Sequence, residues 1–268
     1  MSLSKVKLVV SDMDGTLLNG KGEVSERFFE LFSELQNRGI HFAAASGRQY
    51  YSITKKLDRI KNDITIIAEN GGLAKKGETE LLVAKMEQDK IAKVIPILRT
   101  IPNAFIVLCG KNKAYIESKN DMFLALFQEY YASYELVDDL VSVTHDEFFK
   151  IAIYHDECSE SHIYPAVAHL DKEIQIKVSG KNWVDISHFN ANKGFALKML
   201  QHHLGVTKEE TMVFGDYNND LEMMGEAHFS YAMENAHPNI KKIANFSTAS
   251  NNDGGVELIL EALVKSRS

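Results

Sequence analysis

The chain is expected to be organised around one segment, Val9-Val10-Ser11-Asp12-Met13-Asp14-Gly15-Thr16-Leu17. The mostly apolar residues 6–10 indicate a short buried strand that runs into it. Because residues two apart in a strand point to the same side, Asp12 and Asp14 are expected to leave the strand end together, and Gly15 permits the sharp turn that follows. Two carboxylates held close repel unless a cation or a shared proton relieves them, so the pair predicts a Mg²⁺ site with a carboxylate nucleophile.

Two other structures are compatible with this segment. Asp and Gly are common in surface turns, so a plain turn is an alternative. A calcium-binding loop of the pattern D-x-[DN]-x-[DN]-G would need Gly at the sixth position, where the chain has Leu17, and a helix before it, where the chain has a strand. The calcium loop is therefore disfavoured.

The composition is that of an ordinary globular protein. The 268 residues are 45% hydrophobic and 25% charged, enough for one large or two modest domains. The net charge of −7 gives no indication of a nucleic-acid partner, and no stretch is apolar enough for a membrane span or a secretory signal. Cys109 and Cys158 are too far apart for a C-x-x-C motif, so we expect a cytoplasmic protein without a disulfide framework. The sequence does not indicate an oligomeric state.

Strands and helices alternate after the first strand. A helix over 24–38 is indicated by apolar residues at helical spacing, by Ser25 as a cap and by Gly39 after its end. A strand over 40–45, a helix over 49–60 and a strand over 64–68 follow. This alternation is typical of a parallel sheet.

The pattern changes in the middle of the chain and returns near its end. The middle suggests hairpins at 77–78 and 105–117, helices over 87–100, 121–131 and 159–170, and strands over 149–154, 174–178 and 183–186. Pro96 should kink or break the first of these helices. A helix over 193–204, ended by Gly205, and a strand over 211–214 resume the alternation. We therefore expect an α/β fold, a Rossmann-like parallel-sheet core (1–82 and 189–268) with an inserted α+β cap domain (83–188).

Polar residues follow the predicted strands and open one helix, as a binding edge requires. Asp12, Asp216 and a backbone carbonyl near Asp14 offer the oxygen ligands that Mg²⁺ prefers. Hydroxyl, amide and ammonium donors for a phosphate come from Ser46, the nearby backbone, Lys193 and Asn219.

Each of these later residues also has an ordinary explanation. Ser46-Gly47 alone is a common turn between a strand and a helix, and a lone lysine such as Lys193 is usually solvated. The segment from Asp216 to Asp220 imitates a calcium loop, but its sixth position is Leu221 and its twelfth is Ala227. A functional site is favoured because four groups occur in this order at predicted strand ends or helix starts. They are Asp12 with Asp14, Ser46-Gly47, Lys193, and Asp216 with Asn219 and Asp220.

The four motifs together resemble those of the haloacid dehalogenase superfamily of phosphotransferases. Its D-x-D-G-T motif is matched by Asp12-Met13-Asp14-Gly15-Thr16, its Ser/Thr by Ser46, its Lys by Lys193, and its G-D-x-x-N-D by residues 215–220. The long insertion and Asn70-Gly71-Gly72 resemble the Cof-type subfamily, which has an α/β cap.

The resemblance implies a role for each residue. Asp12 would be the nucleophile that forms an aspartyl phosphate, and Asp14 the general acid and base. Mg²⁺ would be held by Asp12, Asp14 and Asp216. The phosphoryl group would contact Met13, Ser46, Gly47, Lys193 and Asn219. Asp220 would orient Lys193 or a metal-bound water.

The substrate is expected to be a small phosphorylated metabolite, most plausibly a sugar phosphate. Candidate contacts are Arg48 and Asn70, which follow core strands, and Trp183 and Asp185, which share one face of a cap strand while Val184 and Ile186 share the other. Alternatives are a phosphatase for nucleotides or for coenzymes such as flavin mononucleotide or pyridoxal phosphate, a phosphomutase, and a non-catalytic regulator that binds phosphometabolites. Simple exposure of the Trp183 face is equally compatible with the pattern.

Overall fold

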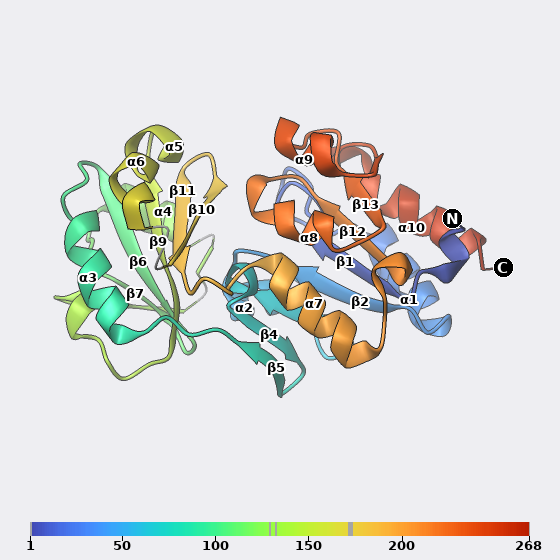
Figure 1. The fold of residues 1–268 in the computed structure, drawn as a ribbon, viewed down its shortest axis with the longest axis horizontal. Helices are drawn as coiled ribbons and strands as arrows, with labels where there is room; N and C mark the ends of the chain where they lie inside the picture. The colour runs from blue at the N-terminus through green and yellow to red at the C-terminus, as the bar shows by residue number, and fades with distance from the viewer. Residues whose placement is uncertain (1, 129, 132, 171–173, 268) are drawn as a thin grey trace.

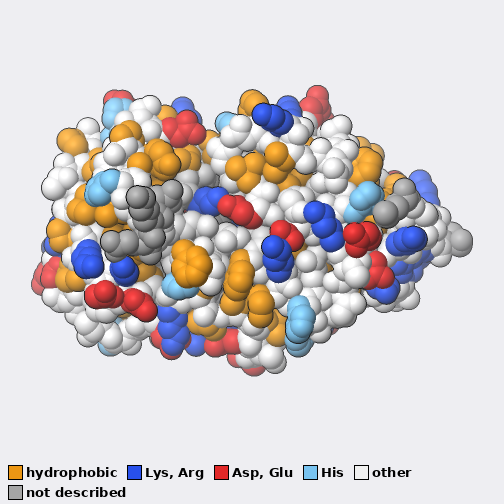
Figure 2. Space-filling view, viewed as in Figure 1, with side chains coloured by type: hydrophobic (Ala, Val, Ile, Leu, Met, Phe, Trp, Pro, Cys, Tyr) orange, Lys and Arg blue, Asp and Glu red, His pale blue; other side chains and the backbone are white. Residues whose placement is uncertain are grey.

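The computed structural model describes residues 2–128, 130–131, 133–170 and 174–267. Its strands, within these ranges, form an eight-stranded sheet and a six-stranded sheet, which lie in two neighbouring parts of the molecule (Figure 1). We call the elements from α3 to β11 the cap and the remaining elements the core. Acidic and basic side chains are interspersed over the face that Figure 2 shows.

The core sheet is built from both ends of the chain, in the order β14-β13-β12-β1-β2-β3-β4-β5. Strand β1 lies inside it and pairs in parallel with β2 and β12. β3 pairs antiparallel with β4, and β4 pairs antiparallel with β5, so this edge is a hairpin. The strands are β1 (Leu8–Asp12), β2 (His41–Ala45), β3 (Thr65–Ala68), β4 (Leu73–Lys76), β5 (Thr79–Val83), β12 (Thr211–Gly215), β13 (Phe229–Ala232) and β14 (Phe246–Ser247).

Helices α1 and α7 of the core each begin after a capping side chain. Ser25 Oγ accepts a hydrogen bond from Phe28 N (3.0 Å) before α1, and Asn192 Oδ1 accepts one from Phe195 N (2.7 Å) before α7. Gly205 ends α7 in the left-handed conformation, with φ of 63°. The helices are α1 (Glu26–Asn37), α2 (Tyr50–Lys56), α7 (Lys193–Leu204), α8 (Leu221–Gly225), α9 (Pro238–Ile243) and α10 (Gly255–Lys265). Short 3₁₀ turns are η1 (Leu3–Lys5), η2 (Glu69–Gly71), η5 (Lys208–Glu210), η6 (Asn218–Asp220) and η7 (Asn251–Asp253).

The cap sheet has the order β10-β11-β9-β6-β7-β8 and is antiparallel except between β7 and β8. Its strands are β6 (Ala104–Gly110), β7 (Ala114–Ile116), β8 (Tyr134–Leu136), β9 (Phe148–His155), β10 (Gln175–Gly180) and β11 (Trp183–Ser187). Its helical elements are α3 (Gln88–Leu98), α4 (Asp121–Phe127), η3 (Leu140–Ser142), α5 (Ser159–His162), α6 (Tyr164–Val167) and η4 (Ala168–Leu170). The core and the cap each have their own cluster of buried apolar side chains.

Several expected helices differ from those observed. α2 ends at Lys56 rather than near residue 60, and α3 is not broken at Pro96 but ends two residues later, at Leu98. The expected helix over 159–170 is divided into α5, α6 and η4, because Pro165, in the first turn of α6, has no N–H to donate to the carbonyl of Ser161. Helix α4 ends at Phe127, and residue 129 of the expected longer helix lies outside the described residues.

The predicted α/β class is confirmed, since the core sheet is largely parallel and is built from segments of both ends of the chain. The domain boundaries expected after residues 82 and 188 stay a prediction. Over the described ranges, the structure has no helix with the length and hydrophobicity that a bilayer crossing requires. What matters for the site is that the carboxyl ends of β1, β2, β3 and β12 meet at one edge of the core sheet.

Candidate active site

A cavity of roughly 420 Å³ lies between the core and the cap. From the core it is lined by Asp12, Asp14, Ser46, Gly47, Asp216 and Asn219. From the cap it is lined by Lys150, Trp183, Asp185 and three tyrosines. This volume is within the range of small-molecule sites. The residues that the motifs single out therefore line a space that can hold a metabolite.

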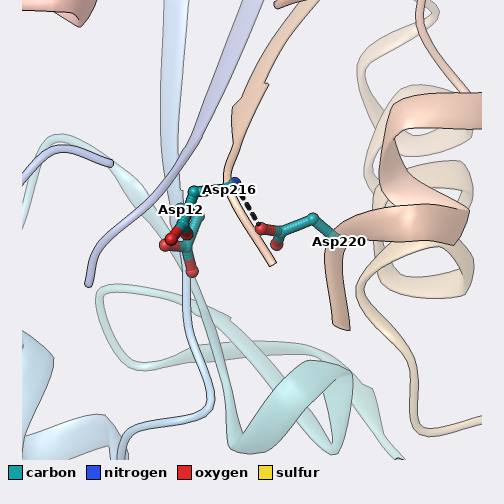
Figure 3. Close-up of side chains that lie close together, drawn as sticks. All are labelled: Asp12, Asp216 and Asp220. Carbon is teal, nitrogen blue, oxygen red and sulfur yellow. Dashed lines mark hydrogen bonds between the residues drawn. The ribbon is translucent and has the colours of Figure 1, made fainter. Parts of the chain in front are cut away.

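Three carboxylates gather at the floor of this cavity. Asp12 ends β1, Asp216 follows β12, and Asp220 lies one turn further on, in η6; Figure 3 shows that they point toward one another. One oxygen from each lies within 4.8 Å of the others. Asp220 Oδ2 accepts hydrogen bonds from the backbone amides of Asp216 (3.0 Å) and Tyr217 (3.2 Å), which fixes the loop after β12.

Lys193 provides a positive charge beneath these carboxylates. It is the first residue of α7 and is fully buried. Its Nζ donates to Asp12 Oδ1 and to Asp220 Oδ1, the second at 2.7 Å. Lys193 is therefore not a solvated surface lysine. Asp220 contacts it directly, as the expected orienting role of Asp220 requires.

The electrostatics of the acidic cluster favour a divalent cation. Burial, followed by the neighbouring carboxylates of Asp12 and Asp220, raises the pKa of Asp216 well above its usual range. Burial likewise raises the pKa of Asp12, against the lowering effect of Lys193. The donors are all oxygens, as Mg²⁺ prefers. A Cβ on Gly15, at φ of 76°, would lie 2.3 Å from Asp216 Oδ2, so glycine is required for this close approach. The residues present fit Mg²⁺.

Asp14 also lines the cavity, but its carboxylate is paired with Arg48. Arg48 Nε and Nη2 donate to its two oxygens at 2.7 and 2.6 Å, in a bidentate arrangement. The side chain of Asp14 is about half exposed, whereas that of Arg48 is buried. The Asp14 carboxylate is thus not one of the three that gather with Asp12; a contribution of Asp14 to metal binding through its backbone carbonyl stays a prediction.

The turn after β2 carries the candidate phosphate donors. Ser46 Oγ accepts a hydrogen bond from Arg48 N (3.1 Å), which leaves its hydroxyl proton available to another acceptor. Asn219 Nδ2 donates to Asn70 Oδ1 (2.9 Å), so Asn219 and Asn70 are already joined to each other. The Met13 side chain is fully buried in the core, and only its backbone could face a phosphate. The phosphate-binding roles stay predictions.

Asp185 of the cap contacts one of these core groups, Asn70. It is buried, and its Oδ2 accepts hydrogen bonds from Asn70 Nδ2 and from Lys150 Nζ (3.1 Å). Val184 and Ile186, its neighbours in β11, belong to the apolar core of the cap. The predicted alternation of β11 is confirmed, and the simple exposure of the Trp183 face is excluded because Trp183 and Asp185 line the cavity.

An aromatic wall, Tyr130, Tyr131, Tyr154 and Trp183, covers the cap side of the cavity. The Trp183 ring lies 5.1 Å from that of Tyr154 and 5.6 Å from that of Tyr130. The Arg48 guanidinium lies over the Tyr130 ring at 4.8 Å. The sequence analysis identified Trp183 alone, because the tyrosines come from other elements and have no common spacing.

Sequence reasoning also missed Lys150 and Glu69. Lys150 Nζ lies 3.2 Å from Glu69 Oε2, and both side chains are almost fully buried. The one available signal was a lysine inside the otherwise apolar run of β9, residues 148–154. A lysine is rarely buried without a charged partner, so such a position predicts an internal ion pair.

A family model of haloacid dehalogenase-like hydrolases matches residues 9–260 of this chain. The chain belongs to the haloacid dehalogenase-like hydrolase family. The resemblance predicted from the four motifs is thus confirmed, as is the prediction of a Rossmann-like core with an inserted cap. The family and its phosphatase members make this protein a phosphoric monoester hydrolase.

Relatives of this hydrolase cover nearly its whole length. It is 33% identical to the 5-amino-6-(5-phospho-D-ribitylamino)uracil phosphatase YbjI of Escherichia coli, over 97% of each chain. The crystal structure of SMU.1108c from Streptococcus mutans is similar with a TM-score of 0.91 and 30% identity, covering 97% of this chain and 99% of the other. The sugar phosphatase BT4131, of subclass IIB, has a TM-score of 0.83 at 19% identity over 96% and 98% of the two chains, and supports the fold alone.

Proposed function

We propose that this hydrolase is a Mg²⁺-dependent phosphatase that releases phosphate from small phosphomonoesters through an aspartyl phosphate on Asp12. The observation that carries the proposal is the position of Asp12. Its buried carboxylate ends β1, lines the cavity, pairs with the Lys193 ammonium and belongs to the acidic cluster with Asp216 and Asp220. A cytoplasmic location remains part of the proposal, on the basis of the cysteine usage.

Mg²⁺ would be held by Asp12 and Asp216, together with the backbone carbonyl of Asp14. When bound, the ion would offset negative charge on the entering carboxylate and on the phosphoryl oxygens. Lys193 supplies a second, permanent positive charge, which contacts Asp12 Oδ1 directly. Asp220 keeps that ammonium in place and also holds the loop that carries Asp216.

The protein side chains would carry out two successive displacements. A carboxylate oxygen of Asp12 attacks phosphorus, and the bond from phosphorus to the ester oxygen breaks. Asp14 gives its proton to the leaving alkoxide and is then a carboxylate, suited to take a proton from the water that attacks the acyl phosphate. Inorganic phosphate leaves and Asp12 is regenerated. Because both oxygens of Asp14 accept hydrogen bonds from Arg48, proton donation to a substrate requires Asp14 to leave Arg48 first.

The substitution Asp14→Asn should therefore affect substrates according to their leaving group. An alkyl phosphate needs a proton on its leaving oxygen, so we expect kcat to fall by about 10²- to 10⁴-fold. A nitrophenyl phosphate, whose leaving group is a weak base, should lose much less in its first step. Pre-steady-state release of nitrophenol measures that step separately. Equal losses in the first step for both substrates would exclude the acid role of Asp14.

Sugar phosphates are the first candidate substrates. Asp185 is held by Lys150 and Asn70 through its Oδ2, and it lines the cavity as a fixed hydrogen-bond acceptor for hydroxyl groups. Trp183 offers an aromatic face to the apolar side of a sugar ring. The cavity volume, roughly 420 Å³, is large enough for a hexose phosphate.

A second candidate is a phosphorylated polyol that carries a planar heteroaromatic ring. The aromatic wall favours it, because rings stack on tyrosine and tryptophan side chains. The relative from Escherichia coli that is 33% identical is named for such a substrate, a phosphoribitylamino-uracil. Nucleotides and coenzyme phosphates belong to the same chemical class. A purely binding regulator is less favoured, since Asp12 and Asp14 are both present. A phosphomutase shares the general layout and stays the lesser alternative among enzymes.

A panel of phosphorylated metabolites tests this proposal. We expect release of inorganic phosphate with Mg²⁺ and loss of activity when EDTA removes it, restored by added Mg²⁺. The ranking of hexose phosphates against ring-bearing polyol phosphates decides between the two substrate classes. Activity that persists undiminished in EDTA would exclude the metal. Binding of phosphometabolites without any phosphate release would favour the regulator instead.

A further inference from the structure

Lys150 reaches from the cap sheet into the active-site turn of the core. It lies in β9, between β6 and β11, opposite Cys109 and Ser187. Its Nζ donates to the carbonyl oxygen of Gly47 at 2.6 Å and to Asp185 Oδ2 at 3.1 Å. Only 3% of its side chain is exposed. One ammonium thus joins the cap sheet to the turn that follows β2.

The carbonyl that Lys150 holds belongs to the peptide unit between Gly47 and Arg48. The N–H of that same peptide unit donates to Ser46 Oγ at 3.1 Å. A peptide unit is planar, so fixing its carbonyl also fixes the direction of its N–H. Lys150 therefore acts on the Ser46 hydroxyl through one rigid group.

A strained turn of the core, Glu69–Asn70, holds the same segment. Glu69 and Asn70 both have positive φ, of 52° and 53°, which is unfavourable for a residue other than glycine. Their amides donate to the carbonyl oxygens of Arg48 (3.1 Å) and Ser46 (3.0 Å). The Ser46–Arg48 segment is thus held by the Glu69–Asn70 turn of the core and by Lys150 of the cap.

The charges around Lys150 are arranged to keep it ionised. Burial by itself lowers the pKa of the ammonium, but the carboxylates of Asp185 and Glu69 outweigh this and raise the pKa above its usual range. Glu69 lies within ion-pair distance, yet neither of its oxygens accepts a hydrogen bond from the described residues. Glu69 therefore balances charge, whereas Gly47 and Asp185 fix the position of the ammonium.

Stability alone does not account for three buried charges at this place. Replacing a buried ion pair or triad with apolar side chains of similar volume is often neutral or stabilising. A methionine would pack at position 150 among the apolar residues of β9. It would leave the carbonyl of Gly47 without its ammonium donor.

We propose that Lys150 is a positioning residue for phosphoryl transfer, which orients the Ser46 hydroxyl through the Gly47–Arg48 peptide unit. This inference rests on the proposed function, since Ser46 is expected to bind the transferring phosphoryl group. Every phosphomonoester presents that group. Lys150 also holds Asp185, the proposed acceptor for substrate hydroxyls. A nitrophenyl phosphate, whose leaving group has no hydroxyl for Asp185 to bind, therefore reports the effect of Lys150 on the Ser46 hydroxyl alone.

The substitution Lys150→Met tests the proposal. We expect kcat/KM to fall by about 30-fold, the equivalent of ~2 kcal/mol, for a nitrophenyl phosphate. Sugar phosphates should lose at least as much, because Lys150 also holds Asp185. The inhibition constant of inorganic phosphate should rise, and the Mg²⁺ concentration for half-activation should stay the same. Lys150→Arg, which keeps a charged donor, should recover part of the loss. Lys113→Met is the matched control, because Lys113 belongs to a partly exposed ion pair with Glu135 in the cap.

A double variant keeps the test decisive if Lys150→Met does not fold. Lys150→Met leaves Glu69 and Asp185 buried without a cation, and this can unfold the protein. Glu69→Gln combined with Lys150→Met restores the original charge of the cluster and leaves Asp185 paired with Asn70. We expect this double variant to fold, with an unchanged circular dichroism spectrum, and to keep the loss of kcat/KM for the nitrophenyl phosphate. Wild-type kinetics with nitrophenyl phosphate in the folded double variant would overturn the proposal.

Binding of inorganic phosphate separates this inference from the proposed function. If the wild type releases no phosphate from any substrate, the phosphatase proposal fails, but calorimetry with inorganic phosphate still reports on the Ser46 turn. Weaker phosphate binding in the double variant than in the wild type would support the positioning role. Equal phosphate binding would overturn it.

Discussion

Asp12→Asn should abolish turnover while leaving the fold intact. An amide is a poor nucleophile, so no aspartyl phosphate can form, and kcat should fall by about 10⁴-fold or more, within the range that loss of a catalytic nucleophile causes elsewhere. The fold should persist because Lys193 keeps its second partner, Asp220, at 2.7 Å. The substitution also removes one of three mutually repelling carboxylates.

Phosphate release and acid-quench trapping of phosphoprotein together measure this effect. The wild type should yield a phosphorylated protein during turnover, and Asp12→Asn should yield none. Asp58→Asn is a matched control, since Asp58 is largely exposed and pairs only with Lys61 among the described residues. A variant that retains more than a few per cent of wild-type activity with Mg²⁺ would show that Asp12 is not the nucleophile.

The core could be predicted well because its signals are local. Helix α7 was placed at residues 193–204 from Asn192, Gly205 and the apolar pattern, and the structure has the same bounds. The cap helices were predicted less well, since their ends depend on packing as well as on propensity. The pattern over 159–170 is helical throughout, yet Pro165 divides it.

The site residues that belong to motifs at strand ends could be predicted from the sequence. Contacts between side chains from distant parts of the chain could not. Asp12, Ser46 and Asp216 follow strands that pair with each other or with a common neighbour. The pairing of Asp14 with Arg48 joins residues 34 positions apart and has no spacing signal. Lys150 was missed for a related reason, because a lysine is assigned to the surface unless its partners are known.

Lys193→Met should have the second large effect, on stability as well as on catalysis. Lys193 is fully buried between Asp12 and Asp220, whose side chains are 6% and 0% exposed. Removing the ammonium leaves both carboxylates buried without their cation, which typically costs about 3–5 kcal/mol. Methionine keeps the length of the side chain, so the loss measures charge rather than volume. Loss of a fixed positive charge beside the transferring oxygens should lower kcat by about 10²- to 10³-fold.

Mg²⁺ should partly compensate for the missing ammonium, because the acidic cluster that Lys193 neutralises is the one proposed to hold the ion. We therefore expect added Mg²⁺ to raise the thermal midpoint more in Lys193→Met than in the wild type. Lys198→Met is the control, since Lys198 lies on the same helix, α7, in an exposed ion pair with Glu226. An unchanged thermal midpoint together with a kcat/KM within threefold of the wild type would contradict both the stabilising ion pair and the phosphate contact. A lower thermal midpoint with unchanged kcat/KM would mean that Lys193 only stabilises the fold. Mg²⁺ and the Ser46 turn would then be the groups that offset the negative charge on the transferring oxygens.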